Sequence, residues 1–337
     1  MLKLQPVAAA DGRQVIIHPG VVRTATSTLQ KHVFAQHPGL YFLGLPARTP
    51  ELEWAVRHVC EADTMHLIAE RLQRAFETGC ADAPAGKPIL ISYENYTLYK
   101  SKDKGLVAER LKNLFPQAKI VFTLRAQESL IVSRYFNDLR RRIKLKSFIT
   151  FEDWYWFERR ESYRTIFDDL RYFPVVEYYA GLFGRQNIRL ILFEEIKIDR
   201  KAFATRFAEA LQVDAAEFER LLGGKRENAT MSSRYYQFWR WFGHFLPRRY
   251  VRDLATRFPD RHHGRPARLT LPAEIRADLV ALCAEDNGNL MKHYHLDLQR
   301  YGYSVPREAM PLSIPERTKG SAPCSPVGAF LGNGPLR

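Results

Sequence analysis

Two stretches of the chain combine hydroxyl and basic side chains as phosphate-binding sites do. The first is Arg23-Thr24-Ala25-Thr26-Ser27-Thr28-Leu29, which follows the apolar run Val15-Ile16-Ile17 and the segment His18-Pro19-Gly20. A strand, a turn and then a helix leave free backbone N–H groups at the helix start, where the helix dipole favours an anion. The hydroxyls of Thr24, Thr26, Ser27 and Thr28 would add donors, and Arg23 a positive charge. The same residues also suit an ordinary helix cap.

This loop differs from two common nucleotide-binding loops. A Walker A loop carries Gly-Lys directly before its Ser or Thr, whereas Ala25 and Thr26 stand at those places and no Lys follows. The Gly-x-Gly-x-x-Gly pattern of dinucleotide-binding proteins is also missing. ATP and dinucleotide binding are therefore disfavoured.

The second stretch follows a later apolar run. Residues Lys119 to Leu124 read as a buried strand that ends at Arg125, and Ser133 comes eight residues later, in a helix expected from Gln127 to Arg142. An Arg at the carboxyl end of a parallel strand faces the crevice where ligands bind, and its planar fork fits a phosphate. Ser133 lies about two turns into the helix, from which its hydroxyl can reach the same group. Taken alone, Arg125 would be an ordinary surface Arg and Ser133 an ordinary helix Ser.

Together, the two stretches resemble the sulfotransferases that use 3′-phosphoadenosine 5′-phosphosulfate (PAPS). The loop of that family typically reads Lys-Thr-Gly-Thr-Thr-Ser/Thr-Leu after a strand, and an Arg with a Ser eight residues later binds the 3′-phosphate. Here Arg23 replaces the Lys and Ala25 replaces the Gly, while Arg125 and Ser133 match the second site. The resemblance spans residues 13 to 305 and is closest to bacterial, carbohydrate-type members. It implies PAPS as donor co-substrate and no metal.

The two replacements bear on activity. Arg23 keeps the charge of the Lys but is bulkier and cannot give up its proton, and Ala25 tightens a loop where Gly moves freely. Nucleotide binding is still expected, and the efficiency of turnover is left open. A weaker match, Lys225 to Thr230, resembles a basic loop of bacterial relatives, in which Arg226 and Asn228 would help hold the nucleotide.

Strand and helix patterns alternate along the chain, which favours an α/β fold. Strands are expected at 15–17, 89–92, 119–124 and 188–193, with helices at 50–76, 103–115 and 127–142 and a mostly helical pattern from 201 onward. The resemblance implies a P-loop-NTPase-like central parallel sheet flanked by helices, with a largely helical C-terminal half. We expect one domain over 1–305, in which 230–268 is a basic, aromatic helical insertion or lid. The Pro- and Gly-rich residues 306–337 are expected to form a disordered tail.

Sulfuryl transfer needs an in-line acceptor and stabilisation of the charge on the leaving phosphate. Arg23 and the loop N–H groups suit the second task, so Arg23 is a candidate catalytic residue as well as a ligand. The acceptor hydroxyl needs a base, which in the family is a Glu or a His. Glu94 is the first candidate, because Ser92-Tyr93-Glu94 resembles a Ser-x-Glu step at a strand end of bacterial members. Its alternative is a loop carboxylate in a salt bridge, and His18 is the second choice for the base.

The chain is strongly basic, with 51 Lys and Arg against 37 Asp and Glu among 337 residues and a net charge of +14. Such an excess indicates an anionic partner. The basic groups at 140–146 and at Lys100, Lys102 and Lys104 would suit an acceptor glycan that carries carboxylates or sulfates. Aromatic and Arg residues at 235–268 would suit a lid, an anionic membrane surface or an ordinary amphipathic helix. Anion sites at strand ends fit a mononucleotide, and no nucleic-acid-binding signature is present.

The sequence thus favours a PAPS-dependent sulfotransferase that acts on a hydroxyl, chiefly of a saccharide or polysaccharide. The alternatives are a phosphotransferase or kinase on a P-loop-like fold, and a degenerate protein that binds PAPS, adenosine 3′,5′-bisphosphate (PAP) or an anionic polymer. No apolar run reaches 18 residues and no signal peptide is evident. The four separated cysteines fit a reducing compartment. The expected location is cytoplasmic, with peripheral contact to the inner face of the membrane as a variant; the oligomeric state is open.

Overall fold

The computed structural model describes residues 4–7, 12–98, 103–144, 148–161, 165–223, 231–243, 250, 254, 257 and 265–306. Contacts divide the chain into two units, Met1–Pro306 and Arg307–Arg337, and every described residue belongs to the first. The expected tail and much of the expected insertion at 230–268 therefore lie outside the described residues. None of the helices within the described ranges is both long and apolar enough to cross a membrane.

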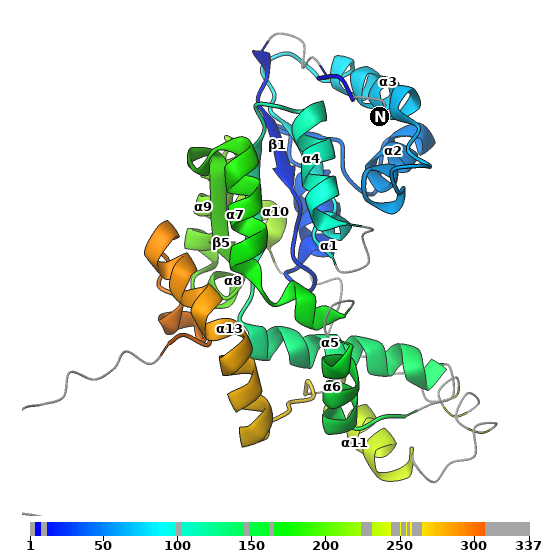
Figure 1. Ribbon diagram of the computed structural model, residues 1–337, viewed down its shortest axis with the longest axis vertical. Helices are drawn as coiled ribbons and strands as arrows, with labels where there is room; N and C mark the ends of the chain where they lie inside the picture. Colours follow the sequence, from blue (N-terminus) through cyan, green and yellow to red (C-terminus); the bar gives the residue numbers. More distant parts are fainter. Residues whose placement is uncertain are drawn as a thin grey trace, which may run out of the picture. The chain divides into compact units, whose positions relative to one another are not determined.

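A five-stranded parallel sheet forms the centre of the unit (Figure 1). Its strands are β1 (Val15–His18), β2 (Tyr41–Phe42), β3 (Ile89–Ser92), β4 (Lys119–Leu124) and β5 (Ile188–Leu192). They lie in the order β2-β3-β1-β4-β5, so β1 is central. All four pairings are parallel. The four strands expected from apolar runs are confirmed, whereas the two-residue edge strand β2 is too short to leave a pattern.

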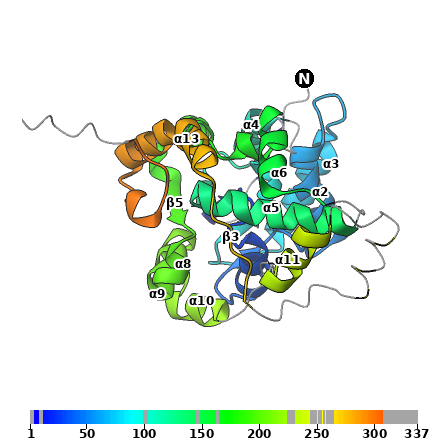
Figure 2. The same cartoon turned by 90° about the horizontal axis from the view of Figure 1, so that it is seen from below.

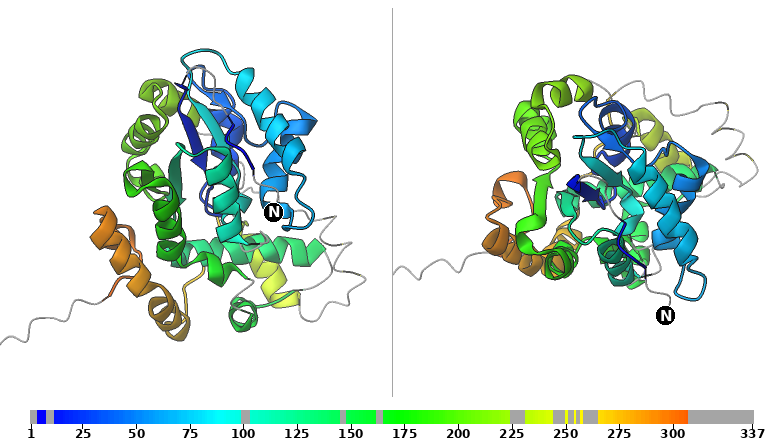
Figure 3. Two further views of the ribbon diagram at one scale, coloured as in Figure 1. Left: turned by 45° about the horizontal axis from the view of Figure 1, so that its top comes forward. Right: turned by 90° about the horizontal axis from the view of Figure 1, so that it is seen from above.

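Helices cover both faces of the sheet (Figure 3). Alternate residues of β1 point into different cores: Ile17 packs in one cluster with residues of α2 (Pro50–Glu61), α3 (Ala69–Ala81), α4 (Lys104–Leu114) and α7 (Tyr172–Phe183). Ile16 packs in a second cluster with residues of α9 (Arg200–Leu211) and α10 (Ala215–Leu222). Burial on both faces explains why the strands read as continuous apolar runs.

The single helix expected at 50–76 is instead two helices, α2 and α3. Thr49 caps α2 by accepting a hydrogen bond from the Leu52 N–H at 3.2 Å. After α2 ends at Glu61, the Asp63 carboxylate accepts the N–H groups of Met65 and His66, both at 3.0 Å. A side chain that satisfies backbone donors in this way stabilises a turn in competition with the helix.

A group of helices lies beyond the carboxyl ends of the strands (Figures 1 and 2). Helix α5 (Gln127–Lys144) starts just after β4, and α6 (Phe151–Arg160) and α11 (Ser233–Phe242) lie along its later turns. Ring contacts join them: Tyr135 of α5 lies 5.3 Å from Phe151 and 6.4 Å from Tyr236. Helix α13 (Ala273–Tyr294) is the last α-helix of the described residues, and the second half of the described chain is largely helical, as expected.

Candidate active site

The loop between β1 and the short helix α1 (Thr26–Thr28) has an unusual backbone. Arg23 and Ala25 have φ angles of 65° and 62°, in the left-handed region that side chains other than Gly rarely adopt. Ala25 therefore holds a conformation that costs about 1–2 kcal/mol for a residue with a Cβ. The expected helix continues as the π-helix Leu29–Phe34. Such turns are frequent at functional sites.

Two of the expected anion donors point elsewhere. The buried Thr24 hydroxyl donates to the Val21 carbonyl at 2.6 Å and lies 3.2 Å from the Thr26 hydroxyl, itself 3.5 Å from the same carbonyl. These hydrogen bonds close the turn from inside, which argues against these two hydroxyls as ligands of an anion. Ser27 is half-buried and Thr28 buried. The donors proposed for an anion are therefore the backbone N–H groups, Ser27, Thr28 and Arg23.

The structure brings the two predicted anion-binding stretches together. Arg23 Nε donates a hydrogen bond to Ser133 Oγ at 3.0 Å. Arg125 Nη1 donates to the Arg23 carbonyl at 2.5 Å, while its Nε donates to Ser129 Oγ at 2.9 Å. The guanidinium of Arg125 also lies 4.7 Å from the Phe193 ring centroid. Arg23, Arg125 and Ser133, which are far apart in sequence, thus form one connected cluster.

This cluster carries an excess of positive charge. Burial, together with the nearby charges of Arg125, Arg140 and Arg134, lowers the pKa of Arg23 to about 10, against the opposing effect of Glu94. Burial also lowers the pKa of Arg125, against the influence of Glu194. Desolvated like charges gain most when a multivalent anion binds between them. The electrostatics of the cluster therefore suit a phosphate-bearing ligand.

Glu94 packs against the loop between β1 and α1. It begins the 3-10 helix η3 (Glu94–Tyr96) directly after β3, and its effect on the Arg23 pKa shows that the two charges interact. A Cβ placed on Gly20, whose φ is 66°, would lie 3.3 Å from Glu94 Cα. Thr97 Oγ1 donates to the Gly20 carbonyl at 2.5 Å and fastens η3 to the loop. The candidate base and the candidate phosphate ligand thus belong to one site.

The surroundings of His18, the second choice for the base, argue against that role. His18 is fully buried, with Nδ1 2.8 Å from Ser92 Oγ and Nε2 3.0 Å from Thr123 Oγ1. Burial lowers its pKa to about 3. Both ring nitrogens are engaged in joining β1 to β3 and β4, so this histidine is structural.

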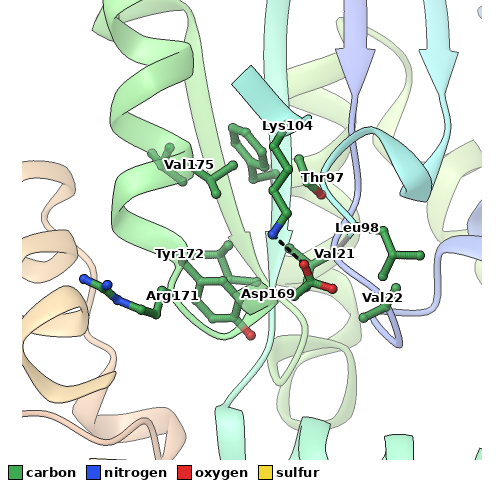
Figure 4. A pocket seen from close by; sticks show the side chains of 12 residues that line it. Val21, Val22, Thr97, Leu98, Lys104, Asp169, Arg171, Tyr172 and Val175 are labelled. Atoms are coloured by element: carbon green, nitrogen blue, oxygen red, sulfur yellow. Dashed lines mark hydrogen bonds and ion pairs between the residues drawn. The ribbon is translucent and has the colours of Figure 1, made fainter. Parts of the chain in front are cut away.

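Lys104 is paired inside the protein. Its Nζ lies 2.6 Å from Asp169 Oδ1 and 2.7 Å from Asp168 Oδ2. Figure 4 shows the Lys104–Asp169 pair beside Val21 and Thr97, at a cavity of about 20 Å³ that has room for one water molecule. The two carboxylates occupy Lys104, which argues against its expected contact with the acceptor. Lys100 and Lys102 lie outside the described residues, as do Arg226 and Asn228.

Ser129 was missed from the sequence, and Glu194, at the acidic end of the last strand, holds the turn at Arg125 in place. Ser129 bonds Arg125 from one helical turn away, a spacing that could have suggested the contact. Glu194 Oε1 accepts the Ala126 N–H at 3.0 Å, and its Oε2 accepts the Tyr303 hydroxyl at 3.2 Å. Ala126 follows Arg125, so Glu194 fixes the turn that carries it. Within the described ranges, no three His, Cys, Asp or Glu side chains gather to hold a metal ion.

Neither a family model nor a curated protein sequence matches the chain. Among solved structures, the sulfotransferase from Alicyclobacillus acidocaldarius aligns with a TM-score of 0.53 at 16% identity, over 88% of this chain and 98% of that one. The sulfotransferase domain of the Synechococcus PCC 7002 olefin synthase aligns at 0.42 and 16% identity, over 82% and 97% of the two chains. The alignment with the Alicyclobacillus acidocaldarius protein supports a shared fold. The chain therefore has the fold of a sulfotransferase.

Proposed function

We propose that this protein is a PAPS-dependent sulfotransferase, which transfers the sulfuryl group of PAPS to a hydroxyl of an acceptor. The observation that carries the proposal is the cluster of Arg23, Arg125 and Ser133 at the carboxyl ends of β1 and β4. Ligands of open parallel sheets bind at that edge. The partly desolvated arginines offer the donors that a nucleotide with two phosphate groups needs.

Each residue has a proposed role. Arg125 and Ser133, with Ser129 holding Arg125 in place, would bind the 3′-phosphate. Arg23 and the backbone N–H groups at the start of α1 would bind the 5′-phosphate and stabilise the charge that develops on it. Arg226 and Asn228 remain predicted nucleotide ligands.

Glu94 is the proposed general base. As the acceptor oxygen forms its bond to sulfur, the bond from sulfur to the 5′-phosphate oxygen breaks, and the hydroxyl proton passes to the Glu94 carboxylate. PAP and the sulfate ester leave. The position of Glu94 against Gly20 supports this role, because the acceptor must approach opposite the leaving phosphate.

The proposed acceptor is a saccharide or polysaccharide, preferably an acidic one. Arg134 and Arg140 of α5 both lower the pKa of Arg23, so their charge reaches the place where the acceptor would meet the sulfuryl group. Arg134 pairs with Asp138 at 3.1 Å, and Arg134 and Arg140 together are the proposed contacts for an acceptor carboxylate or sulfate.

The strained loop supports a second candidate, a protein that binds the nucleotide without turnover. Ala25 has a left-handed backbone conformation, which Gly adopts without steric cost. In this case PAP binding would be retained while transfer is lost, so binding and transfer must be measured separately.

Calorimetry with PAP on the full chain tests the nucleotide site. The wild type should bind PAP, and Arg125→Ala should weaken binding by about 10- to 100-fold, the value of a charge-assisted contact. Arg200→Ala, at an exposed position of α9, is the matched control and should bind as the wild type does. Binding of ATP in place of PAP would reject the proposal in favour of a phosphotransferase. Transfer of labelled sulfate from PAPS to a panel of glycans then separates the enzyme from the inactive binder.

A further inference from the structure

A larger cavity lies at the edge of the sheet, between β2 and the helices α2 and α3. Its volume is about 410 Å³, within the range of small-molecule sites. It shares no lining residue with the small cavity beside Lys104. Its floor is apolar, with Leu43, Leu52 and Ala75, and its rim carries three arginines and two acids.

Arg48 is held in position at this rim. Its guanidinium carbon lies 4.2 Å from the Tyr41 ring centroid, and its Nε donates to the Phe42 carbonyl at 3.2 Å. A guanidinium stacked on a ring and fixed through Nε presents its terminal N–H groups as a fork, which matches a carboxylate or sulfate. Little side-chain entropy is then lost when an anion binds.

The other rim charges leave an excess of positive charge. Arg71 is engaged by Glu51, with N–O distances of 2.7 and 2.8 Å, and stacks 4.1 Å from the Trp54 ring centroid. Among the lining residues, three arginines thus stand against two acids, and Glu51 is taken up mainly by Arg71. The positive end of the 12-residue helix α2, capped by Thr49, lies at the same rim.

We propose that this cavity binds a small organic anion with an apolar body, such as a carboxylate or sulfate ester carried on a hydrocarbon chain. The head group would bind Arg48 and Arg74, and the body would cover the floor formed by Leu43, Leu52 and Ala75. The inference rests on the cavity alone and does not depend on the proposed sulfuryl transfer.

The cavity is joined to the candidate active site through the segment 43–48. The Leu45 N–H donates to the Ser92 carbonyl at 3.4 Å, at the end of β3 and two residues before Glu94. A Cβ on Gly44 would lie 2.5 Å from the same oxygen, so the segment can pass there only with Gly at this position. A ligand on Arg48 therefore binds to the segment that lies against the strand end carrying the candidate base.

Calorimetry with octyl sulfate and octanoate, each below its micelle concentration, tests the site on the full chain. Both probes should bind, and the double variant Arg48→Gln/Arg74→Gln should lose about tenfold or more in affinity. Arg200→Gln makes one of the same charge changes on α9 and should leave both affinities unchanged. Circular dichroism of each variant verifies that it is folded.

Three results would overturn the proposal. The first is that octyl glucoside, which lacks the anion, binds as tightly as octyl sulfate. The second is that inorganic sulfate, which lacks the apolar body, does so. The third is that the double variant binds octyl sulfate with the affinity of the wild type. PAP binding is measured on the same samples. Failure of PAP to bind while octyl sulfate binds would count against the proposed function and not against this site.

Discussion

Arg23 Nε donates a hydrogen bond to Ser133 Oγ at 3.0 Å and so joins the loop after β1 to the second turn of α5. The two residues are 110 positions apart in sequence. Arg125, at the end of β4, completes the connection through the Arg23 carbonyl. The residues proposed to bind the two ends of the nucleotide are therefore in direct contact. A substitution at one end should also change binding at the other.

Replacing Arg23 should weaken the binding of PAP. Arg23→Gln removes the charge but keeps a polar side chain, and we expect a 10- to 100-fold loss of affinity, as for about 1.5–3 kcal/mol of charge-assisted hydrogen bonding. Arg23→Lys should recover part of the loss, because the charge returns without the fork. Calorimetry measures both, with Arg200→Gln as control. Wild-type affinity in Arg23→Gln would remove Arg23 from the site.

Ala25→Gly should stabilise the protein. Gly adopts the φ angle of 62° without steric cost, which relieves about 1–2 kcal/mol, while its greater freedom in the unfolded chain returns about 0.4–1 kcal/mol. The net gain in the free energy of unfolding should be up to about 1.5 kcal/mol. Urea denaturation measures it. The matched control Ala210→Gly, in helix α9, should instead lose about 1 kcal/mol. A loss of the same size in Ala25→Gly would contradict the strained loop.

Glu94→Gln should abolish most turnover while PAP still binds. The amide keeps the shape of the side chain but cannot take a proton, so we expect a fall of about 100-fold or more in kcat. Sulfate transfer and PAP calorimetry on the same preparation separate the two effects. Glu128→Gln, on the outer side of α5, is a control that should retain activity. Full turnover by Glu94→Gln would leave Glu94 as a loop carboxylate that only pairs with nearby charges.

The stability of the protein should fall as the pH is lowered. The pKa of His18 is about 3 in the folded protein and 6.5 in the unfolded chain, so between these values the unfolded chain binds more protons. The stability that this group contributes is complete above about pH 6.5 and is lost progressively toward pH 3, by on the order of 5 kcal/mol in total. Urea denaturation at several pH values should show a smaller slope in His18→Gln. An identical slope would mean that another group causes the effect.

The sequence by itself determined the fold class, four of the five strands and the residues at their carboxyl ends. These features are local: a buried parallel strand is a short apolar run, and the ligands follow directly after it. The local pattern was insufficient to predict two features. The turn at Asp63 depends on a side chain that competes with the helix for backbone N–H groups, and strand β2 has too few residues.

Only the tertiary structure decided what each side chain touches. It turned Thr24 and Thr26 into the loop, placed His18 between two hydroxyls, and joined Arg23 to Ser133. It also assembled the cavity at Arg48 from segments that carry no motif. The physical reason is that burial and long-range packing set these contacts. A hydroxyl that can donate to a ligand can equally donate to a carbonyl, and which of the two it meets depends on how the chain folds around it.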